Sequence, residues 1–459
     1  MLKPYEEYKK IDLLWLDIIP SHWQCMRNKN ILTEINVRSL DGSEELLRIS
    51  QYTGVTIRRH NKSKVGMRDA ETLEGYKIVK KNDIVMNIML AWNGSTGASA
   101  FDGIVSPAYS VFRVKQDVNP WYIHYLFRIP AVTNYFKAYS TGVIESRLRL
   151  YPEKLFMLTS IIPPREEQDQ IVRFLDWKLA KINKLIRAKK KQIELLNEQK
   201  QVIINNAVTK GLDPNVPMKD SGIEWIGTIP EHWKVLYLSQ TATEQSISNK
   251  DIHNQNLLSL SYGKIINKDI NTTDGLLPAS FDTYQIVHNG NIILRLTDLQ
   301  NDHKSLRVGL ATQTGIITSA YTCLLPRENV IPEFLYLLLH SYDICKVFYG
   351  MGGGVRQSIG FDDIRRLLIP VPPLEEQKQI VDFCYAKSNF IEGFLVGIEK
   401  EILLLTEYRT RLISDVVTGK VDVRGIEIPE YEAVPDDVTE DELDGESVTD
   451  DEAEEAEVE

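Results

Sequence analysis

The chain has 459 residues, enough for two to four domains with cores of their own. Its 43% hydrophobic and 25% charged residues are typical of a folded globular protein, and no apolar run approaches the ~20 residues that a membrane span needs. Four scattered cysteines show no metal-binding spacing and favour a reducing, cytoplasmic setting.

The net charge of −11 is concentrated at the end of the chain. From Glu430 onward the sequence carries sixteen Asp or Glu and neither Lys nor Arg; without this segment 53 basic side chains face 48 acidic ones, a net charge of +5. A mildly basic body is compatible with nucleic acid. Residues 426–459 are predicted to form a disordered acidic tail, which either aids solubility or mimics DNA.

Two similar segments follow one another along the body. Residues 15–23 (WLDIIPSHW) recur as residues 225–233 (WIGTIPEHW), and Val/Ile-rich runs between Gly, Asn and Asp turns follow each copy. An apolar helix is predicted to begin near Pro120 in the first half and near Pro332 in the second. We predict mixed α/β globules over residues 1–162 and 222–371, with a linker at residues 212–221.

A long helical segment ends each half. Residues 163–211 begin PPREEQ and residues 372–425 begin PPLEEQ, at a constant offset of 209 residues, and both starts are typical of a helix N-terminus. Apolar residues then recur at alternating spacings of four and three, which predicts a coiled coil and a rod of roughly 65 Å. We predict that the two helices pair, with Lys200 and Arg409 at corresponding positions. Lys189 interrupts the first seam where the second has Ile398.

Two strings resemble methyltransferase motifs but stand in the wrong context. Residues 348–352 (FYGMG) match the FxGxG loop, and residues 119–122 (NPWY) partly match (N/D)PP(Y/F/W). The loop should follow a strand and precede the second string, whereas here it follows a helical pattern and comes later. His22 and His232 have no second ligand at metal spacing, so we expect them to pack beside the neighbouring Trp. We therefore expect neither a catalytic site nor a cofactor or metal site in this chain.

Basic and polar residues in the turns between strands are candidates for phosphate anchoring and for reading base edges. The first globule offers Arg58, Arg59, Lys62 and Lys64, and the second offers Arg295, Thr297, Lys304 and Arg307. Arg147 and Arg356 precede the two long helices, again 209 residues apart. For each residue a solvated loop is the alternative, or packing at the helix base for the last two.

The chain resembles the specificity subunit of type I restriction–modification enzymes over about residues 10–425. The match rests on the WIGxIPxHW opening, the LAWNGSTG and GIVSPAYSVFRV strings, the PPxEEQxxIV helix starts and the VTxG helix ends. It implies an α+β fold in which two long antiparallel coiled-coil helices separate two target recognition domains in a pseudo-twofold repeat. It also implies that each domain reads half of a bipartite target in double-stranded DNA.

The resemblance further implies two methyltransferase subunits and restriction subunits as partners, which hold the S-adenosylmethionine, ATP and Mg. Carried over residue by residue, it places the following in the DNA sites: Asn87, Trp92, Asn93, Ser106 and Tyr109 in the first domain, and Arg295, Ser319 and Tyr321 in the second. AWNGS has no copy in the second half, which agrees with two unlike half-sites. A stand-alone DNA methyltransferase or nuclease, and a coiled-coil adaptor that does not bind DNA, remain as alternatives.

Overall fold

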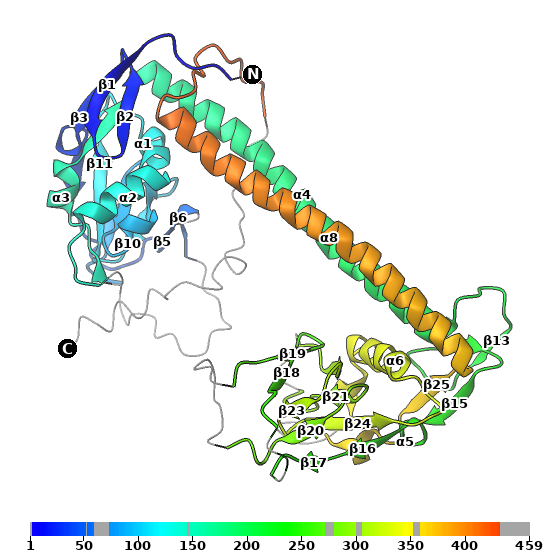
Figure 1. Cartoon of the computed structure of the whole chain (residues 1–459). Helices are drawn as coiled ribbons and strands as arrows, with labels where there is room; N and C mark the ends of the chain where they lie inside the picture. Colours follow the sequence, from blue (N-terminus) through cyan, green and yellow to red (C-terminus); the bar gives the residue numbers. More distant parts are fainter. Residues whose placement is uncertain are drawn as a thin grey trace. The chain divides into compact units, whose positions relative to one another are not determined.

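The computed structural model describes residues 2–51, 53–58, 73–144, 147–250, 252, 254–270, 280–299, 305–351 and 359–431 (Figure 1). The chain forms two compact units: unit 1 contains Met1–Lys189 and Lys400–Glu459, and unit 2 contains Lys190–Glu399. Arg59, Lys62, Lys64, Lys304, Arg356 and the acidic tail from residue 432 lie outside the described residues. Ile426, within the predicted tail, accepts a hydrogen bond from Gln170 Nε2 at 2.8 Å.

Unit 1 is built on a four-stranded antiparallel sheet with the strand order β4-β11-β8-β9. These strands are β4 (Leu32–Ile35), β8 (Ile84–Asn87), β9 (Thr96–Ala98) and β11 (Tyr109–Val114). Antiparallel pairs flank the sheet: β1 (Tyr8–Leu13) with β2 (Leu16–Pro20), β3 (Gln24–Arg27) with β12 (Thr159–Ile162), β5 (Leu47–Ser50) with β6 (Gly54–Ile57), and β7 (Lys77–Val79) with β10 (Gly103–Val105). The short helices are α1 (Pro120–Phe127), α2 (Pro130–Tyr139) and α3 (Pro152–Met157).

Unit 2 repeats the order of the central sheet, as β16-β24-β21-β22, and has one additional strand, β17, beside the pair β20–β23. Its central strands are β16 (Ala242–Gln245), β21 (Ile292–Leu294), β22 (Val308–Leu310) and β24 (Thr322–Pro326). Around them lie β13 (Met218–Asp220) with β14 (Thr228–Pro230), β15 (Lys234–Tyr237) with β25 (Leu368–Val371), β18 (Leu258–Ser261) with β19 (Lys264–Asn267), and β17 (Ile247–Ser248) with β20 (Gln285–Val287) and β23 (Gly315–Ile317). Its short helices are α5 (Leu238–Thr241), α6 (Pro332–Ile344) and α7 (Phe361–Ile364). The predicted mixed α/β repeat is confirmed.

Both faces of each central sheet are covered. In β8, Ile84 and Met86 pack with helical residues such as Tyr122 of α1, while Val85 points the other way and packs with Ile49 of β5. β21 divides in the same manner, because Ile292 and Leu294 pack with α6 and Ile293 packs with Leu258 of β18. Successive strand residues face opposite sides, so a central strand covered on both faces is apolar throughout.

The helix start at Asn119 explains one of the methyltransferase-like strings. Asn119 Oδ1 accepts a hydrogen bond from the Trp121 backbone N–H at 2.8 Å, and Pro120 occupies the first helical turn of α1. This is an ordinary N-cap with proline behind it. The other string follows α6 and forms a 3₁₀ turn at Val347–Gly350 rather than a loop after a strand. Neither string has the structural context of a methyltransferase site.

The long helices α4 (Arg165–Lys210) and α8 (Leu374–Val417) pair antiparallel within each unit (Figure 1). In unit 1, Arg409 Nη1 donates to Asn183 Oδ1 at 3.1 Å, and in unit 2, Lys200 Nζ lies 2.6 Å from Glu392 Oε1. Both members of the two contacts are 209 residues apart, so one contact is the repeat copy of the other. The predicted pairing of the helices is confirmed, with Lys200 and Arg409 in corresponding roles. Among the described residues no helix is both long and apolar enough to cross a membrane.

Lys189, which interrupts the predicted seam, has a partner on the other helix. Its Nζ lies 2.6 Å from Glu401 Oε2, within unit 1. The repeat equivalents of these two residues are Ile398 and Gln192, which cannot form an ion pair. The contact therefore distinguishes one half of the coiled coil from the other.

Each globule is fastened to the first turn of the long helix that follows it. Glu167 of α4 accepts a hydrogen bond from Trp23 Nε1 at 2.9 Å, and its other oxygen lies 2.7 Å from His22 Nε2. Glu376 of α8 does the same for Trp233 and His232, at 3.0 and 2.7 Å. Both repeated histidines thus lie beside their Trp, as predicted, and share its carboxylate. Within the described ranges, no group of three or more His, Cys, Asp or Glu could hold a metal ion.

The glutamine after each of these glutamates completes the junction. Gln168 Oε1 accepts from the Asn119 backbone N–H at 2.7 Å, and Gln377 Oε1 accepts from that of Ile331 at 2.8 Å. Their Nε2 groups donate to the carbonyl oxygens of Pro163 and Pro372, at 2.8 and 2.9 Å. Because both glutamines are fully buried, each repeated EEQ string ties the start of α1 or α6 to a long helix.

Candidate nucleic-acid interface

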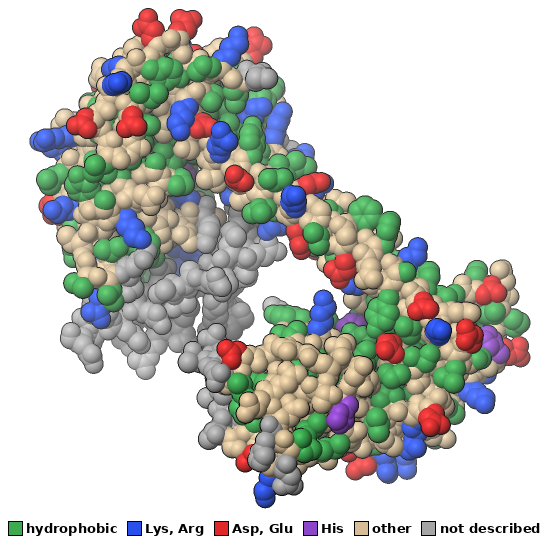
Figure 2. Space-filling view, viewed as in Figure 1, with side chains coloured by type: hydrophobic (Ala, Val, Ile, Leu, Met, Phe, Trp, Pro, Cys, Tyr) green, Lys and Arg blue, Asp and Glu red, His purple; other side chains and the backbone are tan. Residues whose placement is uncertain are grey.

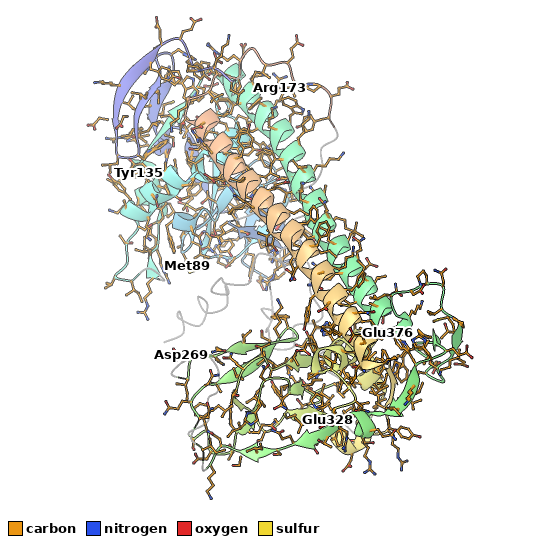
Figure 3. The ribbon with its side chains drawn as sticks, turned by 45° about the vertical axis from the view of Figure 1, so that its right-hand side comes forward. Met89, Tyr135, Arg173, Asp269, Glu328 and Glu376 are labelled. Carbon is orange, nitrogen blue, oxygen red and sulfur yellow. The ribbon has the colours of Figure 1, made fainter. Side chains whose placement is uncertain are left out.

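In unit 1 three segments with predicted DNA contacts meet at one end of the central sheet. Asn87, the last residue of β8, pairs with Tyr109, the first of β11, so the loop after β8 and the turn before β11 leave the sheet side by side. The Leu150 backbone N–H donates to the Ile88 carbonyl at 2.8 Å, which brings the segment after Arg147 to the same loop. Met89, labelled in Figure 3, lies in this loop.

The AWNGS string folds this loop through its own side chains. Asn93 Oδ1 accepts from the backbone N–H and the hydroxyl of Ser95, at 3.2 and 2.9 Å. Trp92 Nε1 donates to the Met89 carbonyl at 2.9 Å, and the indole ring lies 5.1 Å from Lys137 Nζ. Trp92 and Asn93 remain partly exposed.

Asn87 is different, because its side chain is fully buried and its Oδ1 accepts from the Met89 backbone N–H at 3.1 Å. Asn87 therefore caps the loop from inside, and its direct contact with DNA stays a prediction. A polar residue at the end of a strand has the same sequence signature whether it faces solvent or caps its own loop.

The SPAY turn before β11 is stabilised by a buried lysine. The Lys77 ammonium donates to the Tyr109 carbonyl at 2.6 Å, and burial lowers the pKa of Lys77 while Glu34 opposes that shift. Tyr109 is 8% exposed, and its direct contact with DNA likewise stays a prediction. Ser106 stays partly exposed in the turn. In unit 2 the amide of Gln285, which also begins a strand, donates to the carbonyls of Thr318 and Tyr321.

The same three segments converge in unit 2. Leu294, the last residue of β21, pairs with Thr322, the first of β24, so the loop that starts at Arg295 lies beside the turn that contains Ser319. The Ile359 backbone N–H donates to the Leu296 carbonyl at 3.0 Å and repeats the contact of Leu150, which is 209 residues earlier. Ser319 is exposed, and Arg295, Thr297 and Tyr321 are partly exposed.

Arg307 does not face solvent. Its side chain is fully buried and donates to backbone carbonyls of the loop after β21, and its direct contact with DNA stays a prediction. Sequence reasoning missed this because a basic residue before a short strand shows no sign of which distant carbonyls surround it.

Two predicted arginines of unit 1 occupy different places. Arg147 is exposed. The chain around it turns back on itself, so that a Cβ built on Gly142 would lie 2.8 Å from the carbonyl carbon of Arg147. Arg58 is also exposed but follows β6, at the opposite end of the β5–β6 hairpin from its turn. Arg128, which sequence reasoning missed, donates to the carbonyls of Gln51 and Thr96 and holds that turn against β9. The segment that follows Arg147 therefore reaches the sheet end through Leu150, whereas Arg58 lies away from it.

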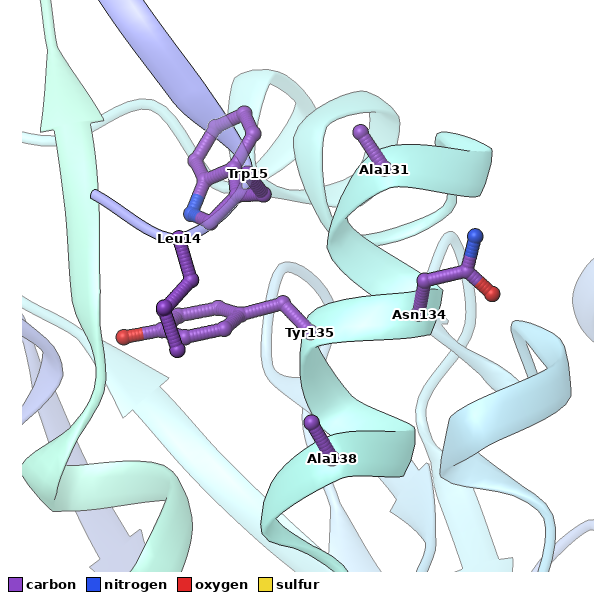
Figure 4. A pocket seen from close by; sticks show the side chains of 6 residues that line it. All are labelled: Leu14, Trp15, Ala131, Asn134, Tyr135 and Ala138. Atoms are coloured by element: carbon purple, nitrogen blue, oxygen red, sulfur yellow. The ribbon is translucent and has the colours of Figure 1, made fainter.

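Charge and cavities add little to this site. On the face shown in Figure 2, basic and acidic side chains are interspersed. A cavity of about 350 Å³ lies in unit 1 between the β1–β2 turn and α2 (Figure 4). Its walls are apolar apart from the amide of Asn134, the hydroxyl of Tyr135 and the indole nitrogen of Trp15. It offers no acid–base pair or nucleophile for catalysis.

Known proteins are similar to this chain in sequence and in fold. Residues 245–399 match the type I restriction modification DNA specificity domain. The chain is 25% identical over 383 residues to the type I restriction enzyme MjaVIII specificity subunit of Methanocaldococcus jannaschii, which covers 78% of this chain and 85% of that protein. It is 26% identical over 321 residues to the MjaX specificity subunit of the same organism, 68% of this chain and 70% of that protein.

A solved structure has a similar fold, with a TM-score of 0.62 at 14% identity over 88% of this chain and 99% of that one. It is described as the structural basis underlying complex assembly and conformational transition of the type I R-M system. The specificity-domain match lies in unit 2, the two relatives span most of the chain, and both units share one strand order. On these grounds the chain is similar, in sequence and in fold, to specificity subunits of type I restriction–modification enzymes.

Proposed function

We propose that this chain reads a bipartite target in double-stranded DNA, with recognition domains at residues 1–162 and 222–371 that each read one half-site. One observation carries the proposal. The same three segments converge at equivalent ends of two sheets with the same strand order, while the side chains that they present differ. Side chains of these kinds read base edges in the grooves of DNA. The first domain offers Trp92, Asn93 and Ser106, and the second offers Arg295, Thr297, Ser319 and Tyr321.

Basic residues would supply affinity without sequence content. Arg147 is exposed beside the loop after β8 and can neutralise a phosphate. We keep Arg58, Arg59, Lys62, Lys64, Lys304 and Arg356 as further candidates for phosphate contact. Such contacts release counterions, so binding should weaken as salt rises.

Two exposed apolar patches on the coiled coil support a scaffolding role. Unit 2 exposes Leu195 of α4 and Phe394 of α8, and each lies one residue before a seam position on the same flank of the helix pair. Unit 1 exposes Leu404 and Leu185, which stand 209 residues from Leu195 and Phe394. Exposed apolar patches often mark protein–protein contacts. Two equivalent patches fit two methyltransferase subunits, one for each unit.

In this proposal the chain is not catalytic and acts in the cytoplasm. The methyltransferase subunits hold S-adenosylmethionine and methylate adenine, and the restriction subunits use ATP and Mg to cleave DNA. The length of α4 and α8 sets the spacer between the half-sites.

The direct experiment is to map methylated adenines in DNA treated with the chain and its partner methyltransferase subunits. We expect one bipartite motif with an unspecified spacer. A single contiguous motif would contradict the proposal. Saturable binding of S-adenosylmethionine by the chain alone would favour a stand-alone methyltransferase, and a complex without retained duplex at low salt would favour an adaptor.

A further inference from the structure

The guanidinium of Arg307 is surrounded by the backbone of one loop. A guanidinium carries five N–H donors in a rigid plane. Nη1 donates to the carbonyl oxygens of Thr297 at 2.7 Å and Arg295 at 3.2 Å, and Nη2 donates to that of Asp298 at 3.1 Å. Three carbonyls from four consecutive residues thus point at one buried side chain.

Arg307 is also fixed from its other side. Its Nε donates to the Tyr349 hydroxyl at 2.9 Å, and the tyrosine ring lies 5.1 Å from its Cζ. Its backbone N–H donates to Oδ2 of Asp343, a fully buried carboxylate of α6, at 2.6 Å. A buried charge is tolerated when its donors are satisfied, and here the hydrogen bonds also determine where it sits. Arg307 therefore connects α6 to the loop after β21.

The loop itself needs such support. Asp298 has a φ of +57°, in the left-handed region that residues with a side chain rarely adopt. Leu296 and Leu299 are buried beneath the loop, whereas Arg295 and Thr297 are partly exposed. The backbone path that the guanidinium fixes therefore decides where the two exposed side chains point.

Unit 1 holds the equivalent loop in another way. Ser95 directly precedes β9 as Arg307 directly precedes β22, and Ser95 bonds the side chain of Asn93 within its own loop. The buried arginine is thus specific to unit 2. A substitution there should affect one half of a bipartite target.

We propose that Arg307 is a positioning residue that sets the base preference of the second recognition domain. It acts through the backbone of residues 295–298 and does not touch DNA itself. This inference rests on the proposed function, because it assumes that Arg295 and Thr297 face a half-site.

The experiment compares the wild-type complex with one that carries Arg307→Lys, each reconstituted from the full chain and its methyltransferase subunits. Lysine keeps the charge but has a single ammonium, which cannot hold three carbonyls in one plane. Mapped adenine methylation should keep one half-site unchanged. Discrimination against wrong bases in the other half-site should fall by about tenfold, the scale of one weakened base contact. Arg366→Lys, the same change at an exposed position of unit 2, serves as the control and should keep the motif.

The outcomes separate the inference from the proposed function. Fewer methylated sites with both half-sites unchanged would overturn the inference, because a purely structural role lowers the amount of active complex and not its base preference. A wild-type complex that marks no bipartite motif would overturn the proposed function and the inference with it. If the Arg307→Lys complex does not assemble, Tyr349→Phe takes its place in the comparison, because it removes the hydroxyl that accepts from Arg307 Nε, and from Lys346 Nζ at 3.3 Å, and leaves the guanidinium intact.

Discussion

The two ends of each globule follow different rules. At the junction with the long helix, Glu167 and Glu376 bind the same Trp-His pair with distances that agree within about 0.1 Å. At the sheet end, unit 1 holds its loop with asparagine side chains and unit 2 uses the buried Arg307. The chain thus repeats its supporting contacts and varies its candidate reading surface.

The difference has a physical reason. At the junction both tryptophans and both glutamines are buried, and loss of a partner would leave a polar group unsatisfied at a cost of about 1–3 kcal/mol. Residues such as Trp92 and Ser319 are partly or fully exposed, where substitutions usually change stability by only about ±0.5 kcal/mol. A duplicated chain can therefore change its reading loops while its junctions stay alike.

The largest effect should come from Glu167→Ala. Glu167 is 5% exposed and accepts hydrogen bonds from Trp23 and the Tyr5 hydroxyl, besides its contact with His22. Its removal would leave several of these groups without a hydrogen-bond acceptor. We expect a loss of about 3–5 kcal/mol in the free energy of unfolding of unit 1, measured by urea denaturation with hydrogen exchange to assign the unit. Glu376→Ala should cost less, about 1–3 kcal/mol, because Glu376 is 24% exposed. Equal losses would contradict this ranking.

Substitutions of the glycines that end the two long helices should also have different effects at the two junctions. Both have a positive φ, +75° for Gly419 and +74° for Gly211. A Cβ at Gly419 would meet Pro20, with Cγ at 2.7 Å and Cδ nearer still, whereas the nearest atom at Gly211 is Glu376 Oε1 at 3.2 Å. Gly419→Ala should therefore cost about 2–4 kcal/mol and Gly211→Ala about 1–2 kcal/mol by the same measurement. Equal losses would show that strain at φ, which both glycines share, dominates over the clash, and the reverse order would contradict the prediction.

Variants in the two exposed patches test whether the two halves of the coiled coil bind partner subunits equivalently. Leu404→Glu should remove the methyltransferase subunit from unit 1 alone, and Leu195→Glu that from unit 2 alone, as measured by native mass spectrometry. Placing a charge in an apolar contact should weaken each association by about thirtyfold. Leu403→Glu, at an exposed neighbour off the flank, is the control. Full occupancy of both partner sites in all three variants would contradict the docking role.

The smallest effect should come from the repeated polar contacts between the helices. Lys200 and Glu392 are 19% and 46% exposed, and pairs this accessible contribute about 0–1 kcal/mol. The hydrogen bond from Lys200 lowers the pKa of the Glu392 carboxyl. Its contribution is therefore present above the unfolded pKa and is lost as the pH falls through the lower folded pKa. In the Glu392→Gln variant the free energy of unfolding should no longer show this decrease at acidic pH. A pH profile identical to that of the wild type would contradict the contribution of the Lys200–Glu392 contact.

Periodicity and repetition predicted the scaffold well. The four-three spacing of apolar residues specifies both long helices, since a 3.5-residue period needs a partner helix. Strand-like runs between turns gave the mixed α/β class. The sequence predicted the junction only in part. The repeated EEQ strings were interpreted as a favourable first helical turn. Because the HW strings repeat as well, the two kinds of string could have been predicted to contact each other.

The reading surface was harder to predict. Asn87, Tyr109 and Arg307 were selected as polar or aromatic residues in turns, yet all three are buried. The side chains of Asn87 and Arg307 bond to backbone amides and carbonyls, which no side-chain pattern reveals, and Arg307 meets carbonyls up to 12 residues away in sequence. The partner of Lys189 lies even further along the chain, at Glu401. Contacts that depend on the folded path of the backbone are beyond sequence periodicity.

The central claim is that two separate readers share one scaffold. Its most direct test exchanges residues 30–150 for the corresponding residues of another recognition domain, keeps the junction residues Trp23 and Glu167, and maps methylated adenines. We predict that one half-site of the motif changes while the other half-site and the spacer stay the same. A change in both half-sites, or in neither, would contradict the account.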